Sequence, residues 1–102
     1  MHVAYSQLAA QIIVSLLRES DEPAIRLVRH GDVLARWQVR YEELPEKLRS
    51  RNRPRGKRLT NAVQALEREH GLVARGKDRV ILVVDHAGLV ELAAQQLDTR
   101  VT

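Results

Sequence analysis

The stretch Arg58–Val84 reads RLTNAVQALEREHGLVARGKDRVILVV, and its first half carries a helical pattern. Positions at spacings of three and four residues form one stripe, made of Leu59, Val63, Leu66 and His70. This periodicity predicts a helix over 59–70 with the stripe facing inward. Gly71 comes next, and glycine readily adopts the left-handed conformation that often follows a helix end.

The second half of the same stretch has the pattern of two short strands. Residues 72–75 and 79–84 are mostly aliphatic and lie on either side of Gly76-Lys77-Asp78. Glycine and aspartate are residue types of tight turns. We therefore expect a β-hairpin with a positively charged tip.

Helices are also expected towards both ends of the chain. Residues 6–19 place six aliphatic side chains on one helical face, with Ser6 as the N-cap and a stop at Asp21-Glu22-Pro23. Residues 86–98 carry four apolar side chains on one face, and Asp85 precedes them as a capping residue.

The segment 25–41 supports two interpretations. Its apolar residues alternate with polar ones from Val33 to Tyr41, which is the pattern of a half-buried strand. A helix from Asp32 would instead align Leu34, Trp37, Tyr41 and Leu44. Trp, Val and Tyr favour strands, so the preferred expectation is a β-hairpin over 25–41. Trp37 continues the apolar alternation, so it is expected in the core and not as a platform for base stacking.

The middle of the chain changes from acidic to strongly basic. Residues 41–48, YEELPEKL, predict a short helix with its acids in the first turn, where the helix dipole favours them. The next ten residues contain no acid and six cations, namely Arg49, Arg51, Arg53, Arg55, Lys57 and Arg58. Pro54 and Gly56 predict an irregular connector here. Like charges at this density repel one another, so we expect this connector to contact a polyanion.

The composition limits the class of protein. A single domain, 1–102, fits the length, and 44% hydrophobic with 29% charged residues is a folded composition. Without cysteine, disulfides and thiolate metal sites are excluded. The four histidines lack metal-ligand spacing. We expect no metal and no cofactor.

No catalytic constellation is visible in the sequence. The Gly-Lys pairs at 56–57 and 76–77 lack the other residues of a phosphate-binding loop, and the serines lack a nucleophile-elbow context. The apolar runs 8–17 and 80–84 are too short for a bilayer, and no secretory signal is apparent. These features predict a cytoplasmic protein that is not an enzyme and has no membrane partner. No small-molecule effector is evident either.

The order helix, strand, short helix, second helix and hairpin resembles the winged helix-turn-helix superfamily, most closely over 41–84. YEELPEKL is similar to the positioning helix of these domains, and Arg58–Val84 is similar to a recognition helix that leads into the wing. Two features differ from the commonest pattern: a longer connector over 49–57, and one extra residue between Leu66 and Gly71. The resemblance implies an α+β winged helix with flanking helices. It also implies a recognition helix in the major groove.

The expected contact residues follow from the helical stripe. If Leu59, Val63 and Leu66 face inward, the outward side chains are Thr60, Asn61, Gln64 and Arg68. Asn and Gln pair with adenine and Arg pairs with guanine, so these are types that read bases. Phosphate contacts are expected from the six cations of 49–58 and from the hairpin cations Arg75, Lys77 and Arg79. Asp78 at the tip opposes such a contact.

We therefore expect a sequence-specific double-stranded DNA-binding protein, a small transcriptional regulator associated with the nucleoid. A homodimer through 6–19 and 86–98 is expected, because a small core would leave their apolar faces uncovered. A net charge of +4 agrees with a polyanionic partner. The alternatives are an architectural, recombination, replication or partition factor, and a protein-interaction module on the same fold. RNA is less favoured because aromatic residues for stacking are few.

Overall fold

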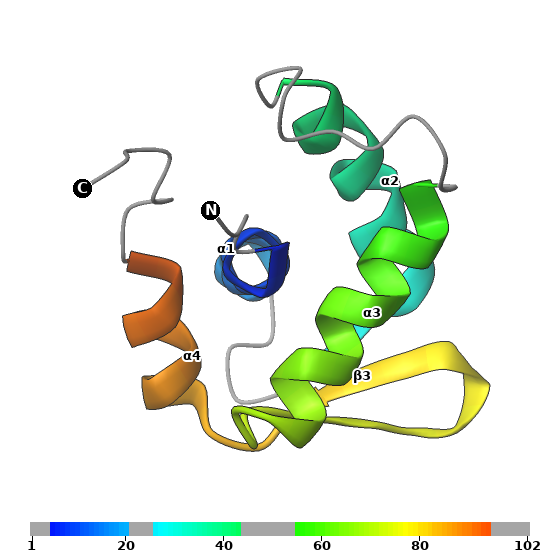
Figure 1. Cartoon of the computed structure of the whole chain (residues 1–102). Helices are drawn as coiled ribbons and strands as arrows, with labels where there is room; N and C mark the ends of the chain where they lie inside the picture. The colour runs from blue at the N-terminus through cyan, green and yellow to red at the C-terminus, as the bar shows by residue number, and fades with distance from the viewer. Residues whose placement is uncertain (1–4, 21–25, 44–54, 95–102) are drawn as a thin grey trace.

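The computed structural model describes residues 5–20, 26–43 and 55–94. In this part of the chain the fold is α+β, with four α-helices and a small three-stranded antiparallel sheet (Figure 1). The elements are, in order, α1 (Tyr5–Glu19), β1 (Leu27–Arg29), α2 (His30–Glu42), α3 (Arg55–Arg68), β2 (Val73–Arg75), the short 3-10 helix η2 (Lys77–Arg79), β3 (Val80–Val83) and α4 (His86–Ala94). None of the helices in the described ranges is long and apolar enough to cross a membrane.

The sheet connects the segment before α2 to the hairpin after α3. β3 is the central strand and pairs antiparallel with β1 on one side and β2 on the other. Val28 lies opposite Ile81, and both are buried. Leu27 lies opposite Leu82, and both are exposed. Because alternate residues of a strand face opposite sides, the sheet has one face in the core and one face outside.

α1 lies between the other helices and packs against all three of them (Figure 1). Eight of its fifteen residues are buried. A helix that contacts neighbours on several sides needs apolar residues around much of its circumference, which explains this burial. Gln11 adds polar links, since its Nε2 donates to the Ala93 carbonyl at 3.2 Å and its Oε1 accepts from Arg40 at 2.9 Å.

The aromatic side chains of the chain form one cluster at an end of the core. The Trp37 ring lies 6.0 Å from the Tyr5 ring and 6.1 Å from the Tyr41 ring, measured between centroids. Trp37 has no exposed surface. The expectation that Trp37 belongs to the core is confirmed.

The expected hairpin over 25–41 is wrong. Only Leu27–Arg29 forms a strand, and His30–Glu42 is helix α2. The buried residues of α2 are Val33, Trp37 and Tyr41, at a spacing of four. Val39, which an alternating strand would bury, is 61% exposed. Packing of the aromatic cluster thus overrides the strand propensity of Trp, Val and Tyr.

The boundaries of the next helices also differ from expectation. Tyr41 and Glu42 complete α2 and do not begin a separate helix, while 44–48 lie outside the described residues. α3 begins at Arg55, so 55–58 are helical and do not belong to an irregular connector. Gly56 occupies the first turn of α3, where its carbonyl accepts a hydrogen bond from Thr60 Oγ1 at 3.0 Å.

The end of α3 accommodates the extra residue between Leu66 and Gly71. Gly71 has a φ of 64°, which confirms the expected left-handed position. The amides of Glu69 and His70 both donate to the Ala65 carbonyl, so the last turn is wider than a regular one. His70 is exposed and follows the helix, so its expected place on the inward stripe is wrong.

The two end helices are confirmed, with corrections to their limits. α1 starts at Tyr5, so Ser6 lies inside its first turn and is not the N-cap. α4 covers His86–Ala94, and 95–98 lie outside the described residues. Asp85 Oδ1 accepts a hydrogen bond from the Gly88 amide at 3.0 Å, which confirms the expected cap.

Candidate nucleic-acid interface

The outward face of α3 carries a single polar stripe. Its members are Lys57, Asn61, Gln64 and Arg68. Their spacings of four, three and four residues place them above one another on the helix. All are exposed except Gln64, which is half-buried. We call these four residues the α3 stripe.

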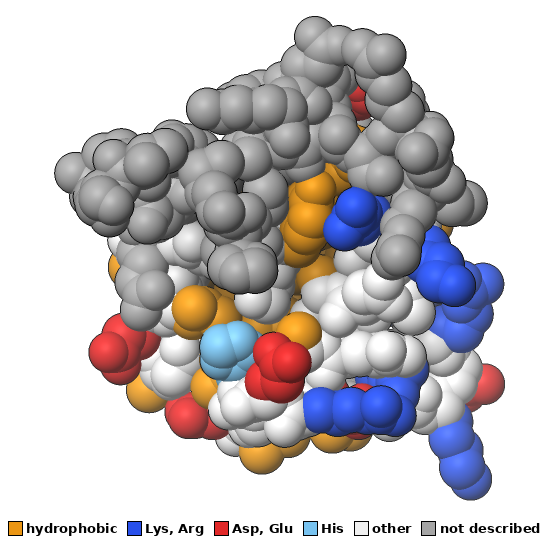
Figure 2. All heavy atoms as spheres, viewed as in Figure 1, with side chains coloured by type: hydrophobic (Ala, Val, Ile, Leu, Met, Phe, Trp, Pro, Cys, Tyr) orange, Lys and Arg blue, Asp and Glu red, His pale blue; other side chains and the backbone are white. Residues whose placement is uncertain are grey.

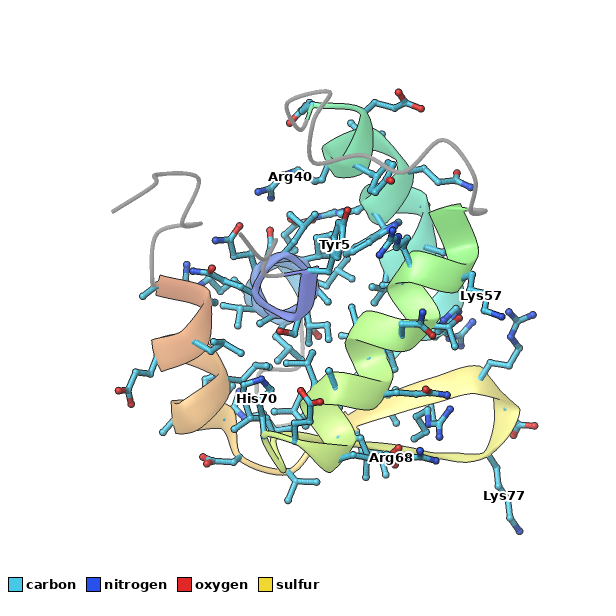
Figure 3. The ribbon with its side chains drawn as sticks, viewed as in Figure 1. Tyr5, Arg40, Lys57, Arg68, His70 and Lys77 are labelled. Atoms are coloured by element: carbon cyan, nitrogen blue, oxygen red, sulfur yellow. The ribbon has the colours of Figure 1, made fainter. Side chains whose placement is uncertain are left out.

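The opposite face of α3 fixes the orientation of this stripe. Leu59, Ala62, Val63 and Leu66 are all at most 3% exposed. Because they anchor the helix in the core, the α3 stripe must point outward. In Figure 3, Lys57 and Arg68 lie at its two ends, on the side of α3 away from α1. The stripe is therefore cationic at both ends and neutral, with amide side chains, in the middle.

The tip of the β2–β3 hairpin adds further charge beside the stripe. Lys77, Asp78 and Arg79 are exposed, and Lys77 projects from the tip in Figure 3. Asp78 and Arg79 have φ values of 61° and 59°, in the left-handed region that L-residues rarely adopt. The tip is therefore a tight turn made of consecutive charged residues.

Arg75 fixes the hairpin to α3. Its Nε lies 3.1 Å from Glu67 Oε1, and its backbone amide donates to Glu67 Oε2 at 3.3 Å. One carboxylate therefore holds both the backbone and the side chain of Arg75. The guanidinium expected to contact phosphate is partly neutralised by this pair.

The side chain of Arg58 lies over Tyr5 and does not belong to the α3 stripe. Its guanidinium carbon lies 5.0 Å from the centroid of the Tyr5 ring, and its buried Nε has no hydrogen-bond partner within residues 5–20, 26–43 and 55–94. Burial raises the pKa of Tyr5, with a further increase from Tyr41, and the charge of Arg58 opposes this. Arg58 thus joins α3 to the aromatic cluster, a position that sequence spacing does not indicate.

The other expected site residues are placed as follows. Thr60 is half-buried, and its hydroxyl donates a hydrogen bond to the Gly56 carbonyl. The side chain of Arg55 is not described, and Arg49, Arg51 and Arg53 lie outside the described residues. The structure therefore brings together the α3 stripe and the hairpin cations, and leaves the rest of the basic run undescribed.

A cavity of about 490 Å³ separates α3 from the hairpin. It is lined by His30, Thr60, Val63, Glu67, Arg75, Gly76, Arg79, Val80 and Ile81. His30 is the first residue of α2, and its Nδ1 is buried and finds no hydrogen-bond partner in the part of the chain that the structure describes. Burial lowers the pKa of His30, and the nearby charge of Arg79 lowers it further. Sequence reasoning missed this histidine because three separate segments build the cavity.

The surface charge is unevenly distributed. In Figure 2, Lys and Arg side chains gather over α3 and the hairpin on the right, whereas acidic side chains lie mainly over α4 and the end of α3 at the lower left.

No group of three or more metal-ligating residues occurs in the described ranges. Comparison with protein-family models, curated proteins and solved structures finds no match to this chain.

Proposed function

We propose that this chain is a winged-helix protein that binds double-stranded DNA in a sequence-specific manner. The observation that carries the proposal is the α3 stripe, which combines two outward amides with a cation at each end of one helix. An α-helix fits the major groove, where Asn and Gln pair with adenine and Arg pairs with guanine. The order of helices and strands agrees with a winged helix, with β2 and β3 as the wing.

In this proposal the two parts of the surface have different tasks. Asn61 and Gln64 read bases, and Arg68 reads guanine or contacts phosphate. Lys57, Lys77 and Arg79 contact phosphates, which supplies affinity without sequence information. The biological role is that of a non-enzymatic transcriptional regulator in the nucleoid, with an architectural or replication factor as the alternative within DNA binding.

Selection from a randomised duplex pool tests this function. Enrichment of one sequence by the full chain, and loss of that enrichment in Gln64→Ala, are the expected results. An unenriched pool together with firm binding would indicate an architectural factor. Absence of binding at low salt would contradict DNA binding altogether.

The proposal also includes a homodimer. Within the described residues the buried face of α1 packs against α2, α3 and α4, so the partner copy does not contact this face. A two-fold dimer would bind a palindromic site with half-sites about one helical turn apart. Light scattering that finds a monomer, both free and bound to DNA, would contradict the proposed homodimer.

One observation favours a protein-interaction module as a second candidate. Leu27, Leu82 and Val84 are 38%, 39% and 66% exposed on the outer side of the sheet. Leu27 and Leu82 are cross-strand partners, so they form a continuous apolar surface. Leu82→Ser should leave DNA affinity unchanged if DNA is the partner. A chain that fails to bind DNA but binds a protein through Leu82 would support this second candidate.

A further inference from the structure

The cavity between α3 and the hairpin has the size and lining of a small-ligand site. Its volume of about 490 Å³ lies within the range of known small-molecule pockets. Val63 and Ile81 are buried and supply an apolar base, while charged side chains stand around them. A cavity of this kind holds an apolar body and orients it by a few polar groups.

The polar groups around the cavity favour an anion. Arg75 and Arg79 line it from the hairpin, and Glu67 lines it from α3. Glu67 is already engaged by Arg75 at 3.1 Å. This leaves the positive charge of Arg79 uncompensated by any ion pair within the described residues.

His30 supplies an unsatisfied polar atom in the same cavity. Its Nδ1 is buried and lacks a hydrogen-bond partner among the described residues. A buried polar atom without a partner in the protein is uncommon and calls for an explanation, such as a bound ion. Protonated histidine donates from both ring nitrogens, so an anion beside Nδ1 would satisfy the atom and offset the repulsion from Arg79.

We propose that this cavity binds the phosphate or carboxylate group of an anion, with His30 and Arg79 as its two ligands. The anion is either a small organic acid or phosphate ester, or a phosphate of the DNA backbone. Both sources offer the same oxygen acceptors. For the small anion, regulation of DNA binding rests on the function proposed above: an occupant that engages Arg79 withdraws a cation of the wing from DNA.

Binding is expected to depend on pH, because protonated His30 adds a positive charge beside Arg79 in the cavity and so attracts an anion more strongly than the neutral ring does. The charged groups around His30 are Arg29 and Asp32 next to it in sequence, Glu67 on α3, and Arg75 and Arg79 on the hairpin. Of these, Arg79 opposes protonation of His30. An anion held between His30 and Arg79 offsets the repulsion between them and raises the pKa of His30. Binding is therefore accompanied by uptake of a proton.

The experiment uses the full chain with inorganic phosphate, citrate, ribose 5-phosphate and a short DNA duplex as separate probes, at constant ionic strength. NMR of the His30 ring and isothermal titration calorimetry report binding at about pH 6 and about pH 8. We expect saturable binding that is tighter at the lower pH. His30→Gln and Arg79→Gln should each weaken it about tenfold, the loss of one charge-assisted hydrogen bond.

Arg36→Gln is the control, because it also removes one positive charge, but Arg36 pairs with Glu19 and does not line the cavity. It should leave the affinity for small anions unchanged. Fluorescence of the single, buried Trp37 verifies that each variant is folded. Arg79→Gln, at an exposed position, keeps the test valid if His30→Gln is unstable.

The outcomes separate the two proposals and the two sources. Binding of a free anion with a shift of the His30 resonances supports a small-anion site. A shift with the duplex alone assigns the site to a backbone phosphate. If the duplex binds while His30 is unaffected and no free anion binds, this inference fails and the proposed function stands. If free anions bind and the duplex does not, this inference stands and the proposed DNA-binding function fails.

Discussion

At the scale of single residues, Gly31 and Gly88 lie in helices but differ in the space around them. A Cβ on Gly88 would lie 2.6 Å from Asp85 Oδ2 and 2.7 Å from Leu72 Cδ2. A Cβ on Gly31 would meet nothing within 4 Å. We expect Gly88→Ala to lower the free energy of unfolding by about 1–2 kcal/mol, since the capping carboxylate or Leu72 must move. Gly31→Ala should raise it by up to about 1 kcal/mol, because alanine favours helix.

Urea denaturation followed by Trp37 fluorescence measures both changes. The opposite signs make each variant the control of the other, since the chemical substitution is identical. Equal effects in the two variants would contradict the packing around Gly88.

Arg79 combines backbone strain with a charge that the proposed function uses. Its φ of 59° costs an L-residue roughly 1–2 kcal/mol, which glycine does not incur. Arg79→Gly is therefore expected to leave stability unchanged or raise it slightly, and to weaken DNA binding. Denaturation and anisotropy titration measure the two effects. A loss of stability that parallels the loss of binding would indicate a structural role only.

His30 makes stability depend on pH in a definite direction. Burial, assisted by Arg79, lowers its pKa in the folded chain below the ordinary value of 6.5. As pH falls below about 6.5 the unfolded chain takes up a proton first, so the His30 contribution to stability is lost. His30→Gln should remove this decline between neutral and mildly acidic pH, as measured by denaturation at several pH values. His70→Gln, which leaves the cavity unchanged, should retain it.

At the scale of elements, the proposed function assigns affinity and specificity to different residues of the α3 stripe. Gln64→Ala should cost about 1–3 kcal/mol on the preferred sequence and little on random DNA, because only base contacts carry sequence information. Lys57→Gln, at the end of the same stripe, should weaken both by the same factor. Anisotropy titrations with a selected and a random duplex make the comparison. Equal losses for Gln64→Ala on both duplexes would contradict its role in base reading.

α3 and the hairpin were predictable from the sequence because their patterns are local. Leu59, Val63 and Leu66 mark the buried face by spacing alone, and Gly71 marks the end of the helix. The outward position of Asn61 and Gln64 follows directly from that face. Arg68 was predictable for the same reason, whereas Lys57 was expected in an irregular connector and belongs to the stripe because α3 begins at Arg55.

α2 was not predictable in this way, because its sequence satisfies two periodicities at once. Val33, Trp37 and Tyr41 fall on one side of a strand and also on one face of a helix. Contacts with Tyr5, about thirty residues earlier, favour the helix. Arg58 and His30 escaped prediction for a related reason: their environments come from α1 and from the hairpin, which are remote in sequence.

At the scale of the whole molecule, the unequal charge of the two sides determines how DNA would be bound. The described cations on the proposed surface are Lys57, Arg68, Lys77 and Arg79, with Arg75 partly neutralised by Glu67. Each phosphate contact releases condensed counterions, so affinity must fall as salt rises. Four contacts give a slope of log affinity against log salt of about −3 to −4.

Neutralising the hairpin tip should reduce this slope. With Lys77→Gln and Arg79→Gln combined, the slope should become shallower by about 1–2, since two contacts are removed. Arg36→Gln is a suitable control, because Arg36 pairs with Glu19 between α2 and α1 and belongs neither to the hairpin nor to the α3 stripe. The same slope in the tip variant and the parent would exclude the hairpin from the interface.

The most direct test of DNA binding is a fluorescence-anisotropy titration of a random duplex with the full chain, repeated over a salt series. The proposal predicts binding at low salt, with a slope of about −3 or steeper. Absence of binding at low salt, or an affinity that does not change with salt, would contradict it.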